Sequence, residues 1–446
     1  MTGRYKAYPE YKRFNSTWFD SLPSHWQSVS MKWITNLYAG GTPSKDNLSF
    51  WENGSIPWLN SGSVNQSVIK KPSAFITRDA FNNSSAKWIP KGSLVMALAG
   101  QGKTKGMVAQ LAIESTCNQS MAAIVPSQIV SPRFLFWWLT SNYQKIRNMA
   151  GGDLRDGLNL DLLGNISCPI FECKEQQKIA NFLDHETAKI DTLIAKQEKL
   201  IELLKEKRQA VISHAVTKGL NPDAPMKDSG VEWLGEVPER WVIKSYRYAC
   251  KIYRGKFGHR PRNDPAFYDG EYPFIQTGDV ARAGKYIKDY KQTLNEKGVG
   301  VSQKFPVGTL MMAIAANIGD TAILGFEAYA PDSVVGFKPK VDIDLEFLRY
   351  SFIAALPALE QTSTQSTQAN LNVDRIGAVQ ASFPSVSEQK EIVAYLDSLL
   401  EQYDDIESKS QKSIELMNER KTALISAAVT GKIDVRDWQE PKEQQG

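Results

Sequence analysis

The stretch that decides the fold is EQQKIANFLDHETAKIDTLIAKQEKLIELLKEKRQAVISHAVT, residues 175–217. A second stretch, EQKEIVAYLDSLLEQYDDIESKSQKSIELMNERKTALISAAVT at 388–430, aligns with it without a gap, and 18 of the 43 aligned positions are identical. Two unrelated helical segments would not share so many residues at one constant displacement, so the pair is an internal repeat.

The repeat extends towards the N-terminus of each copy. WFDSLPSHW at 18–26 matches WLGEVPERW at 233–241, displaced by 215. GSIPWLNSGSV at 54–64 matches GEYPFIQTGDV at 270–280, displaced by 216, whereas from residue 117 onward the displacement is 213. The chain is therefore two tandem halves, and the second half has lost three residues near position 100 of the first.

Each half begins with a mixed domain and ends with the long repeat. Apolar runs bounded by turn residues predict strands at 93–99, 107–113 and 121–126, and again at 308–315, 321–326 and 334–338. We expect both domains to be mixed α/β or α+β. The predicted order is 1–172 for the first mixed domain, 173–220 for the first helix, 221–385 for the second domain with its leading linker, 386–435 for the second helix, and 436–446 for a tail.

The long repeats carry apolar residues every seven positions, which predicts a coiled coil. A simpler alternative is that each helix packs only on its own domain. Gln197 and Ser410 stand at equivalent places inside apolar columns, and such polar residues fix register between paired helices, which favours mutual pairing. The columns are Leu183, Ile190, Gln197, Leu204 and Val211, and Leu396, Tyr403, Ser410, Met417 and Leu424.

The length of these helices indicates a spacer. A 43-residue helix is roughly 64 Å long. The linker NPDAPMKDSGVE passes the chain directly from the first helix to the second mixed domain. We therefore expect an antiparallel pair with a recognition domain at each end and approximate two-fold symmetry within one chain.

SLVMALAGQGKTKG at 93–106 is close to a phosphate-binding loop, with Gly102, Lys103 and Thr104 after an apolar run. A P-loop requires a helix directly after the Lys-Thr pair, because the amides of its first turn hold the phosphates. The continuation KGMVAQLAIEST predicts another strand, and the matching GTLMMAIAANIGDTAILG at 308–325 lacks Gly-Lys-Thr. We therefore predict a variable surface loop.

The composition is that of an ordinary globular protein, with 446 residues, 42% hydrophobic content and a formal net charge of +4. The four cysteines form no CxxC pair and the histidines do not stand at metal-ligand spacing beside them, so we expect reduced thiols and no metal site. No apolar run approaches the roughly 20 residues that span a bilayer, and the N-terminal MTGRYKAYPEYKRF lacks a signal-peptide core. We expect a cytoplasmic protein with no membrane partner.

Positive charge is concentrated in the second domain. KSYRYACKIYRGKFGHRPR at 244–262 contains seven Lys or Arg, no Asp or Glu, and interleaved aromatic residues, a pattern that suits contact with nucleic-acid phosphates. Because about half of it is expected to be strand, only alternate residues can face one way. The candidate DNA-contact residues are Lys70, Lys71, Arg78, Gln101, Lys103, Thr104 and Lys105, and Arg254, Lys256, His259, Arg260, Arg262 and Asn317.

The chain resembles the specificity subunits of type I restriction-modification systems. The resemblance rests on GGTPSKDNLSFWENGSIPWLNSGS at 40–63, on DSGVEWLGEVPERW at 228–241, and on the helical segments that begin EQQKIANFLD and EQKEIVAYLD and end in AVT. The second domain departs from this pattern, with YRGKFGHRPRNDPAFYDGEYPFIQTGD in place of the GGTPS form.

The resemblance implies two target recognition domains, each reading one half of a split, asymmetric double-stranded DNA site. The helices would set the spacing and dock two methyltransferase subunits, and restriction (motor) subunits would complete the complex. The specificity subunit would have no catalytic residues, and S-adenosylmethionine, ATP and Mg²⁺ would be bound by the partners.

Two alternatives are open on the sequence. The chain could be a P-loop NTPase or nuclease that uses Lys103 and Thr104, although it lacks Asn-Pro-Pro-Tyr and any GxGxxG that opens a helix. It could also be a coiled-coil scaffold or adhesin whose mixed domains bind protein or sugar.

Overall fold

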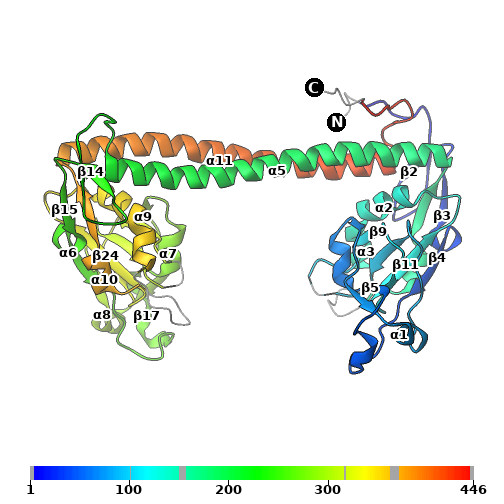
Figure 1. Cartoon of the computed structure of the whole chain (residues 1–446), viewed down its shortest axis with the longest axis horizontal. Helices are drawn as coiled ribbons and strands as arrows, with labels where there is room; N and C mark the ends of the chain where they lie inside the picture. The colour runs from blue at the N-terminus through cyan, green and yellow to red at the C-terminus, as the bar shows by residue number, and fades with distance from the viewer. Residues whose placement is uncertain (1–4, 101, 150–156, 316–317, 362–370, 442–446) are drawn as a thin grey trace. The chain divides into compact units, whose positions relative to one another are not determined.

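The structure is a computed structural model that describes residues 5–100, 102–149, 157–315, 318–361 and 371–441 (Figure 1). The chain divides into two compact units. Unit 1 comprises Met1–Lys196 and Lys412–Gly446, and unit 2 comprises Gln197–Gln411. Each unit therefore contains one mixed domain together with a part of each long helix.

The main sheet of each unit has five strands in the same order. In unit 1 the order is β4 (Thr35–Ala39), β11 (Met121–Pro126), β8 (Leu94–Ala97), β9 (Val108–Leu111), β6 (Val68–Ile69). In unit 2 it is β16 (Cys250–Arg254), β24 (Val334–Pro339), β21 (Leu310–Ala313), β22 (Thr321–Leu324), β18 (Tyr286–Ile287). All neighbours run antiparallel except the last pair of each sheet, which is parallel. The six strands predicted from apolar runs are confirmed.

The central strands are continuous apolar runs because both faces of the sheet are covered. In β8, Leu94 and Met96 belong to the core that also contains the long helices, whereas Val95 belongs to a second core on the opposite face. In β21, Leu310 and Met311 divide between two cores in the same way. Since side chains alternate along a strand, each core receives every second residue.

The smaller sheets repeat as well. Unit 1 has β10 (Thr116–Cys117), β5 (Ile56–Leu59) and β7 (Ala74–Ile76) in one sheet, and the pairs β1 (Tyr11–Arg13) with β2 (Ser21–Pro23) and β3 (Gln27–Ser30) with β12 (Ser167–Ile170). Unit 2 has β19 (Gln292–Leu294), β17 (Tyr268–Phe274), β23 (Ala328–Ala330) and β20 (Gln303–Phe305), and the pairs β13 (Met226–Asp228) with β14 (Glu236–Pro238) and β15 (Val242–Ser245) with β25 (Gln380–Phe383). Apart from β20, whose counterpart in unit 1 is a single bridge between Ile89 and Ser115, the duplication of the sequence is therefore a duplication of topology.

The Gly-Lys-Thr segment connects two antiparallel strands. β8 leads into β9 through residues 98–107, and β9 is a strand, not the helix that a phosphate-binding loop requires. Tyr143 Oη donates to the carbonyl oxygen of Lys103 at 2.5 Å, and Arg147 Nη2 donates to that of Gly102 at 2.5 Å. The corresponding connection in unit 2, residues 314–320, is three residues shorter, as the displacement predicts.

Short helices fill the spaces beside the sheets. Those of unit 1 are α1 (Arg78–Asn82), α2 (Pro132–Ser141), α3 (Tyr143–Asn148) and α4 (Leu160–Gly164), and those of unit 2 are α6 (Tyr246–Ala249), α7 (Thr277–Arg282), α8 (Glu296–Val301), α9 (Leu345–Gln361) and α10 (Val373–Ala378). Pro357 lies inside α9 and cannot donate to the carbonyl oxygen of Ile353, which instead accepts from Gln209 Nε2 at 3.1 Å. A helix-interrupting residue thus creates an attachment to a long helix.

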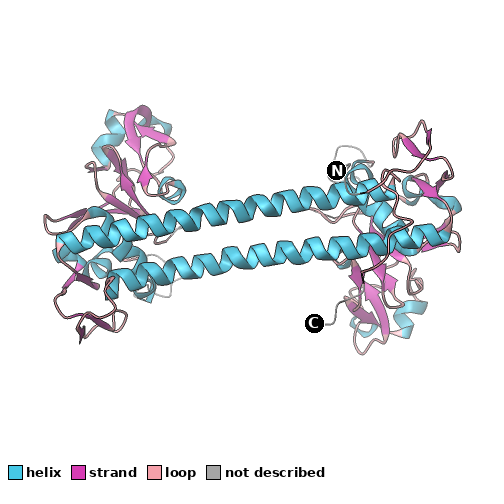
Figure 2. Cartoon of the chain, turned by 90° about the horizontal axis from the view of Figure 1, so that it is seen from above, coloured by secondary structure: helices cyan, strands magenta, loops and turns pink. Residues whose placement is uncertain are grey.

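The two long helices are α5 (Cys173–Lys218) and α11 (Val386–Val429), and they pack side by side (Figure 2). They run antiparallel: in unit 1 Asp191 pairs with Lys421 at 2.6 Å, and in unit 2 Lys205 pairs with Glu407 at 4.0 Å. None of the ten residues of the predicted heptad columns is exposed, and Ser410 is buried. The antiparallel coiled coil is confirmed.

A buried glutamine near the start of each long helix attaches it to its mixed domain. Gln176 accepts from Ser131 N at 2.8 Å and donates to the carbonyl oxygens of Ile129 at 3.1 Å and Phe171 at 2.8 Å. In the second half Gln389 makes the same three kinds of bond, to the backbone of residues 344, 342 and 384. A fully buried amide must satisfy both its oxygen and its nitrogen with hydrogen bonds. In each unit these bonds fix the first turn of the long helix to the mixed domain.

A glycine follows each long helix where the chain passes close to a tryptophan. Gly431 has φ +67°, and a Cβ there would lie 2.4 Å from Pro23 and 3.3 Å from Trp26. Gly219 has φ +76°, and a Cβ would lie 3.2 Å from Trp241. Glycine is required because the left-handed backbone and the approach of the ring both exclude a side chain.

Candidate nucleic-acid interface

The basic run of unit 2 divides between core and surface. Tyr246 is fully buried: its ring stacks on Phe352 with centroids 3.9 Å apart, and its hydroxyl lies 2.8 Å from Ser351 Oγ. Tyr248, two positions later on α6, is 64% exposed. The run is therefore a short helix and a strand, β16, followed by a loop, and only its end carries the clustered surface cations.

This loop, residues 255–267, follows Arg254 at the end of β16. Arg254, Lys256, Arg260 and Arg262 are exposed, and His259 is half-buried. The His259 ring stacks on Phe267 with centroids 4.0 Å apart, and its Nε2 lies 3.0 Å from the Asp264 carboxylate. A hydrogen bond from the backbone N–H of Ala266 lowers the pKa of that carboxyl. The loop is thus organised from within by its own acid and aromatic residues.

The cations of this loop are partly compensated by a distant acid. Asp332, in the turn between β23 and β24, lies 2.6 Å from Arg262 Nη2 and 3.5 Å from Arg260 Nη2. Both arginines and the aspartate are about half exposed, and such surface pairs contribute roughly 0–1 kcal/mol each. The arginines can therefore exchange this carboxylate for a phosphate at little cost.

A pocket of about 330 Å³ opens beside the loop. Its floor is aromatic, with Phe257 and Phe274 buried. Arg262 lies at the pocket with the exposed amides of Gln276 and Gln292, which hydrogen bond to each other. Glutamine and arginine are the side chains that read adenine and guanine edges with paired hydrogen bonds.

Sequence reasoning missed the two glutamines. The signal that could have found Gln276 is its position in FIQTGD, which aligns with Asn60 in WLNSGS, so an amide stands within two residues of the end of equivalent strands in both halves. In unit 1 the Asn60 side chain accepts from Gly62 N at 2.9 Å and caps a short helix; Gln276 likewise stands at the N-cap of α7, and its side chain also hydrogen bonds to Gln292. Gln292 stands on β19 opposite Phe274, and only strand pairing brings it to Gln276.

The candidates of unit 1 lie on three separate segments. Lys70 and Lys71 are exposed after β6, Arg78 is exposed at the start of α1, and Lys103 is exposed in the 98–107 connection. Lys103 also borders a largely apolar pocket of about 400 Å³. Unit 1 therefore presents dispersed cations where unit 2 presents one cluster.

Four of the candidate DNA-contact residues remain to be placed. Lys105 is only 5% exposed, and this burial disfavours it as a phosphate contact. Thr104 is half-buried. Gln101 and Asn317 lie outside the described residues.

Among the described residues, no group of three or more His, Cys, Asp or Glu side chains could hold a metal ion. The described cysteines are free, and burial raises the pKa of the Cys117 and Cys250 thiols to about 12. Within the same residues, no helix is long and apolar enough to cross a membrane.

Comparison with known proteins gives the family. The family described as Type I restriction modification DNA specificity domain matches residues 23–203 and again residues 238–416. The EcoR124I/EcoR124II specificity subunit of Escherichia coli is 31% identical over 164 residues, which cover 36% of this chain and 39% of that protein. The StySPI specificity subunit of Salmonella potsdam is 19% identical over 428 residues, 92% of this chain and 90% of that protein.

Solved structures share the fold. A chain from a structure of type I restriction-modification complex assembly and conformational transition gives a TM-score of 0.73 at 15% identity, covering 92% of this chain and 99% of that chain. The HsdS subunit from Thermoanaerobacter tengcongensis gives 0.54 at 15% identity, with coverage of 92% and 98%. Because the family matches most of both halves, the chain belongs to the DNA specificity subunits of type I restriction-modification systems, which are the non-catalytic part of these enzymes.

Proposed function

We propose that the two mixed domains are target recognition domains, each of which reads one half of a bipartite, asymmetric double-stranded DNA site. The observation that carries the proposal is one five-strand sheet order used twice, with different loops on it. A repeated scaffold presents its loops in the same way, whereas loops of different sequence and length select different bases. A chain with two such domains therefore reads two unlike half-sites. Genomic DNA as the partner agrees with the expected cytoplasmic location.

Within unit 2, we infer that the 255–267 loop contacts phosphates and that the adjoining pocket reads bases. Arg254, Lys256, His259, Arg260 and Arg262 supply the positive charge. The exposed amides at the pocket supply paired donors and acceptors, which phosphate contacts alone would lack. In unit 1 the same roles fall to Lys70, Lys71, Arg78 and Lys103, with Thr104 at the edge of the surface.

We infer that α5 and α11 set the distance between the half-sites and dock two methyltransferase subunits. Both helices expose apolar side chains at equivalent positions: Leu193 and Leu203 on α5 correspond to Ile406 and Leu416 on α11, all at least 39% exposed. The duplication of these exposed apolar side chains at equivalent positions on the two helices supports docking of two copies of one partner. Restriction subunits would join this assembly, and S-adenosylmethionine, ATP and Mg²⁺ would be held by the partners.

The test is a matched deletion of one heptad from each long helix. Removing 194–200 from α5 together with 412–418 from α11 keeps the Asp191–Lys421 and Lys205–Glu407 pairs in register. Seven residues are about 10.5 Å of helix, or about 3 base pairs at 3.4 Å each. The expected result is the same two half-sites with a gap about 3 base pairs shorter, read by mapping methylated adenines in the host genome.

A deletion of 194–200 alone is the control, because it shifts the register on one helix and should abolish methylation. An unchanged gap in the matched deletion would contradict the spacing role. Selection from a random DNA pool, with the methyltransferase present, separates this proposal from a scaffold or adhesin, which would enrich no sequence.

A further inference from the structure

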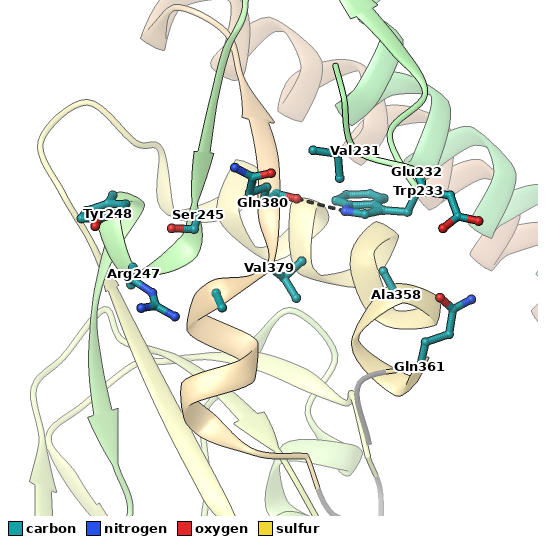
Figure 3. Close-up of a pocket in the computed structure, with 11 residues that line it drawn as sticks. Val231, Glu232, Trp233, Ser245, Arg247, Tyr248, Ala358, Gln361, Val379 and Gln380 are labelled. Carbon is teal, nitrogen blue, oxygen red and sulfur yellow. Dashed lines mark hydrogen bonds between the residues drawn. The ribbon is translucent and has the colours of Figure 1, made fainter. Parts of the chain in front are cut away.

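A second pocket of unit 2 lies away from the 255–267 loop. It has a volume of about 650 Å³ and opens between the loop before β14, the helix α6, and the ends of α9 and α10 (Figure 3). Glu232, Trp233, Tyr248, Ala358 and Gln361 are among the residues that line it. Trp233 Nε1 donates to the carbonyl oxygen of Gln380 at 3.0 Å, which holds the indole ring in place.

The other half of the chain places a lysine at the equivalent position. In unit 1, Lys145 Nζ donates to the carbonyl oxygen of Thr17 at 2.8 Å and to that of Trp18 at 3.3 Å. The repeat displacements of 215 and 213 carry Thr17 and Trp18 to Glu232 and Trp233, and Lys145 to Ala358. Unit 1 therefore contains an ammonium group where unit 2 has a methyl group.

Two observations establish that the positions correspond in space. The loop that contains the tryptophan is closed by the same backbone hydrogen bond in both units, from Phe14 N to Asp20 O at 2.8 Å and from Ser229 N to Gly235 O at 3.1 Å. The residues after Lys145 and Ala358, Ile146 and Leu359, are both fully buried, so the two helices present the same face to their cores.

The walls of the pocket in unit 2 suit a cation. Among the described residues, no N–H or O–H group donates to the carbonyl oxygens of Glu232 and Trp233. These oxygens correspond to the Thr17 and Trp18 oxygens that accept from Lys145 in unit 1. The Glu232 side chain is exposed and adds a negative charge, and the neighbouring Trp233 ring lines the pocket and offers an aromatic face to a cation. Arg247 also lines the pocket, but its guanidinium donates to the carbonyl oxygens of Gly377 at 3.2 Å and Asp374 at 3.3 Å.

We propose that this pocket binds a primary alkylammonium group, either a lysine side chain or a small free amine. The internal lysine of unit 1 shows the chemistry: a compact head with three N–H donors, held by two backbone carbonyl oxygens. The ammonium donor makes these bonds charge-assisted, and the Glu232 carboxylate would add an ionised acceptor. The site is separate from DNA recognition, so it stands or falls independently of the proposed function.

The experiment titrates the full chain with n-butylammonium chloride, the free equivalent of a lysine side chain, at constant ionic strength. The readout is ¹⁹F NMR of 5-fluorotryptophan, with the Trp233 signal assigned by Trp233→Phe. Saturable movement of that signal is expected, and neutral butan-1-ol should not reproduce it. Nα-acetyl-lysine methylamide is the second probe, and tighter binding of that probe than of butylammonium identifies a polypeptide lysine as the source.

Reciprocal variants make the test decisive. Ala358→Lys supplies the ammonium from within and should weaken butylammonium binding by at least about tenfold. Lys145→Ala should open a weaker site in unit 1, which has Thr17 in place of Glu232, so that the Trp18 signal also responds at higher butylammonium concentration. Glu232→Gln should weaken binding about threefold to tenfold. Equal responses of the wild type and Ala358→Lys, or an equal response to butan-1-ol, would overturn the proposal.

Discussion

Asp184 on α5 and Asp397 on α11 occupy equivalent positions, yet their charges are balanced from different places. In unit 1 Arg133, on α2, lies 2.8 Å from Asp184, and Trp137 Nε1 donates to the same carboxylate at 2.9 Å. In unit 2 the position of Arg133 is occupied by Glu346, and Lys285, in the turn after α7, replaces the arginine.

The replacement reverses one charge, and Lys285 supplies a single cation that contacts both carboxylates. Lys285 Nζ lies 2.5 Å from Glu346 and 2.6 Å from Asp397, and Tyr350 donates to Asp397 at 2.6 Å. Burial alone would lower the pKa of Lys285, but its hydrogen bonds to Asp397 and Glu346 raise it. Both units therefore keep an ion pair between the long helix and the mixed domain, but the side chains that form it differ. In unit 2 the pair also connects the turn after α7 to α11.

The largest expected effect comes from the attachment that the two units share. Gln176→Leu and Gln389→Leu should each destabilise their own unit by about 3 kcal/mol, because three buried backbone groups lose their partners. Hydrogen exchange read by mass spectrometry separates the two units. Lys390→Leu, at the next and exposed position of α11, should change little. Clearly unequal effects of the two glutamine variants would break the equivalence.

The next prediction concerns the charged attachment of the long helix, which differs between the two units. Lys285→Met leaves Glu346 and Asp397 without their cation and should cost unit 2 about 2 kcal/mol, more than Arg133→Met costs unit 1, where one carboxylate loses its partner. Adding Glu346→Arg to Lys285→Met recreates the unit 1 arrangement and should restore stability. Chemical denaturation followed in both variants measures this. A double variant no more stable than Lys285→Met would show that the charged attachment of unit 1 cannot replace that of unit 2.

The smallest effect concerns the surface cations. Replacing Arg260 and Arg262 by Ala should weaken DNA binding and lower the slope of log K against log salt by about 2, and Lys70→Ala with Lys71→Ala should do the same through unit 1. Electrophoretic mobility shifts over a salt series give both slopes. Lys409→Ala, on the exposed face of α11, is the control. An unchanged slope in either pair would remove those residues from the phosphate contacts.

The repeat made most of the fold predictable. Continuous apolar runs identified the central strands because both sheet faces are buried, and the heptad columns identified the coiled coil because seven-residue spacing has few other causes. Gly102, Lys103 and Thr104 could be rejected as a phosphate cradle because the sequence after them lacks a helix. Each of these signals is local in the chain.

The site was less predictable because its chemistry depends on residues far apart in sequence. Arg262 appears unopposed in the sequence, but Asp332 reaches it from another strand connection. Tyr246 belongs to the basic run by position and to the core by its helical phase. Gln292 reaches Gln276 only through strand pairing, and Lys105 differs from Lys103 by which way the connection turns.

The composition of unit 1 has a consequence for biosynthesis. Its core includes Leu424, Ala428 and Val435, which leave the ribosome about 250 residues or more after α5 begins at Cys173, whereas unit 2 is one uninterrupted stretch. Domains generally assemble as they emerge, at about 5–20 residues per second. Unit 1 is therefore begun first and completed last. Its N-terminal domain exposes the apolar surface that α11 covers until α11 has been synthesised.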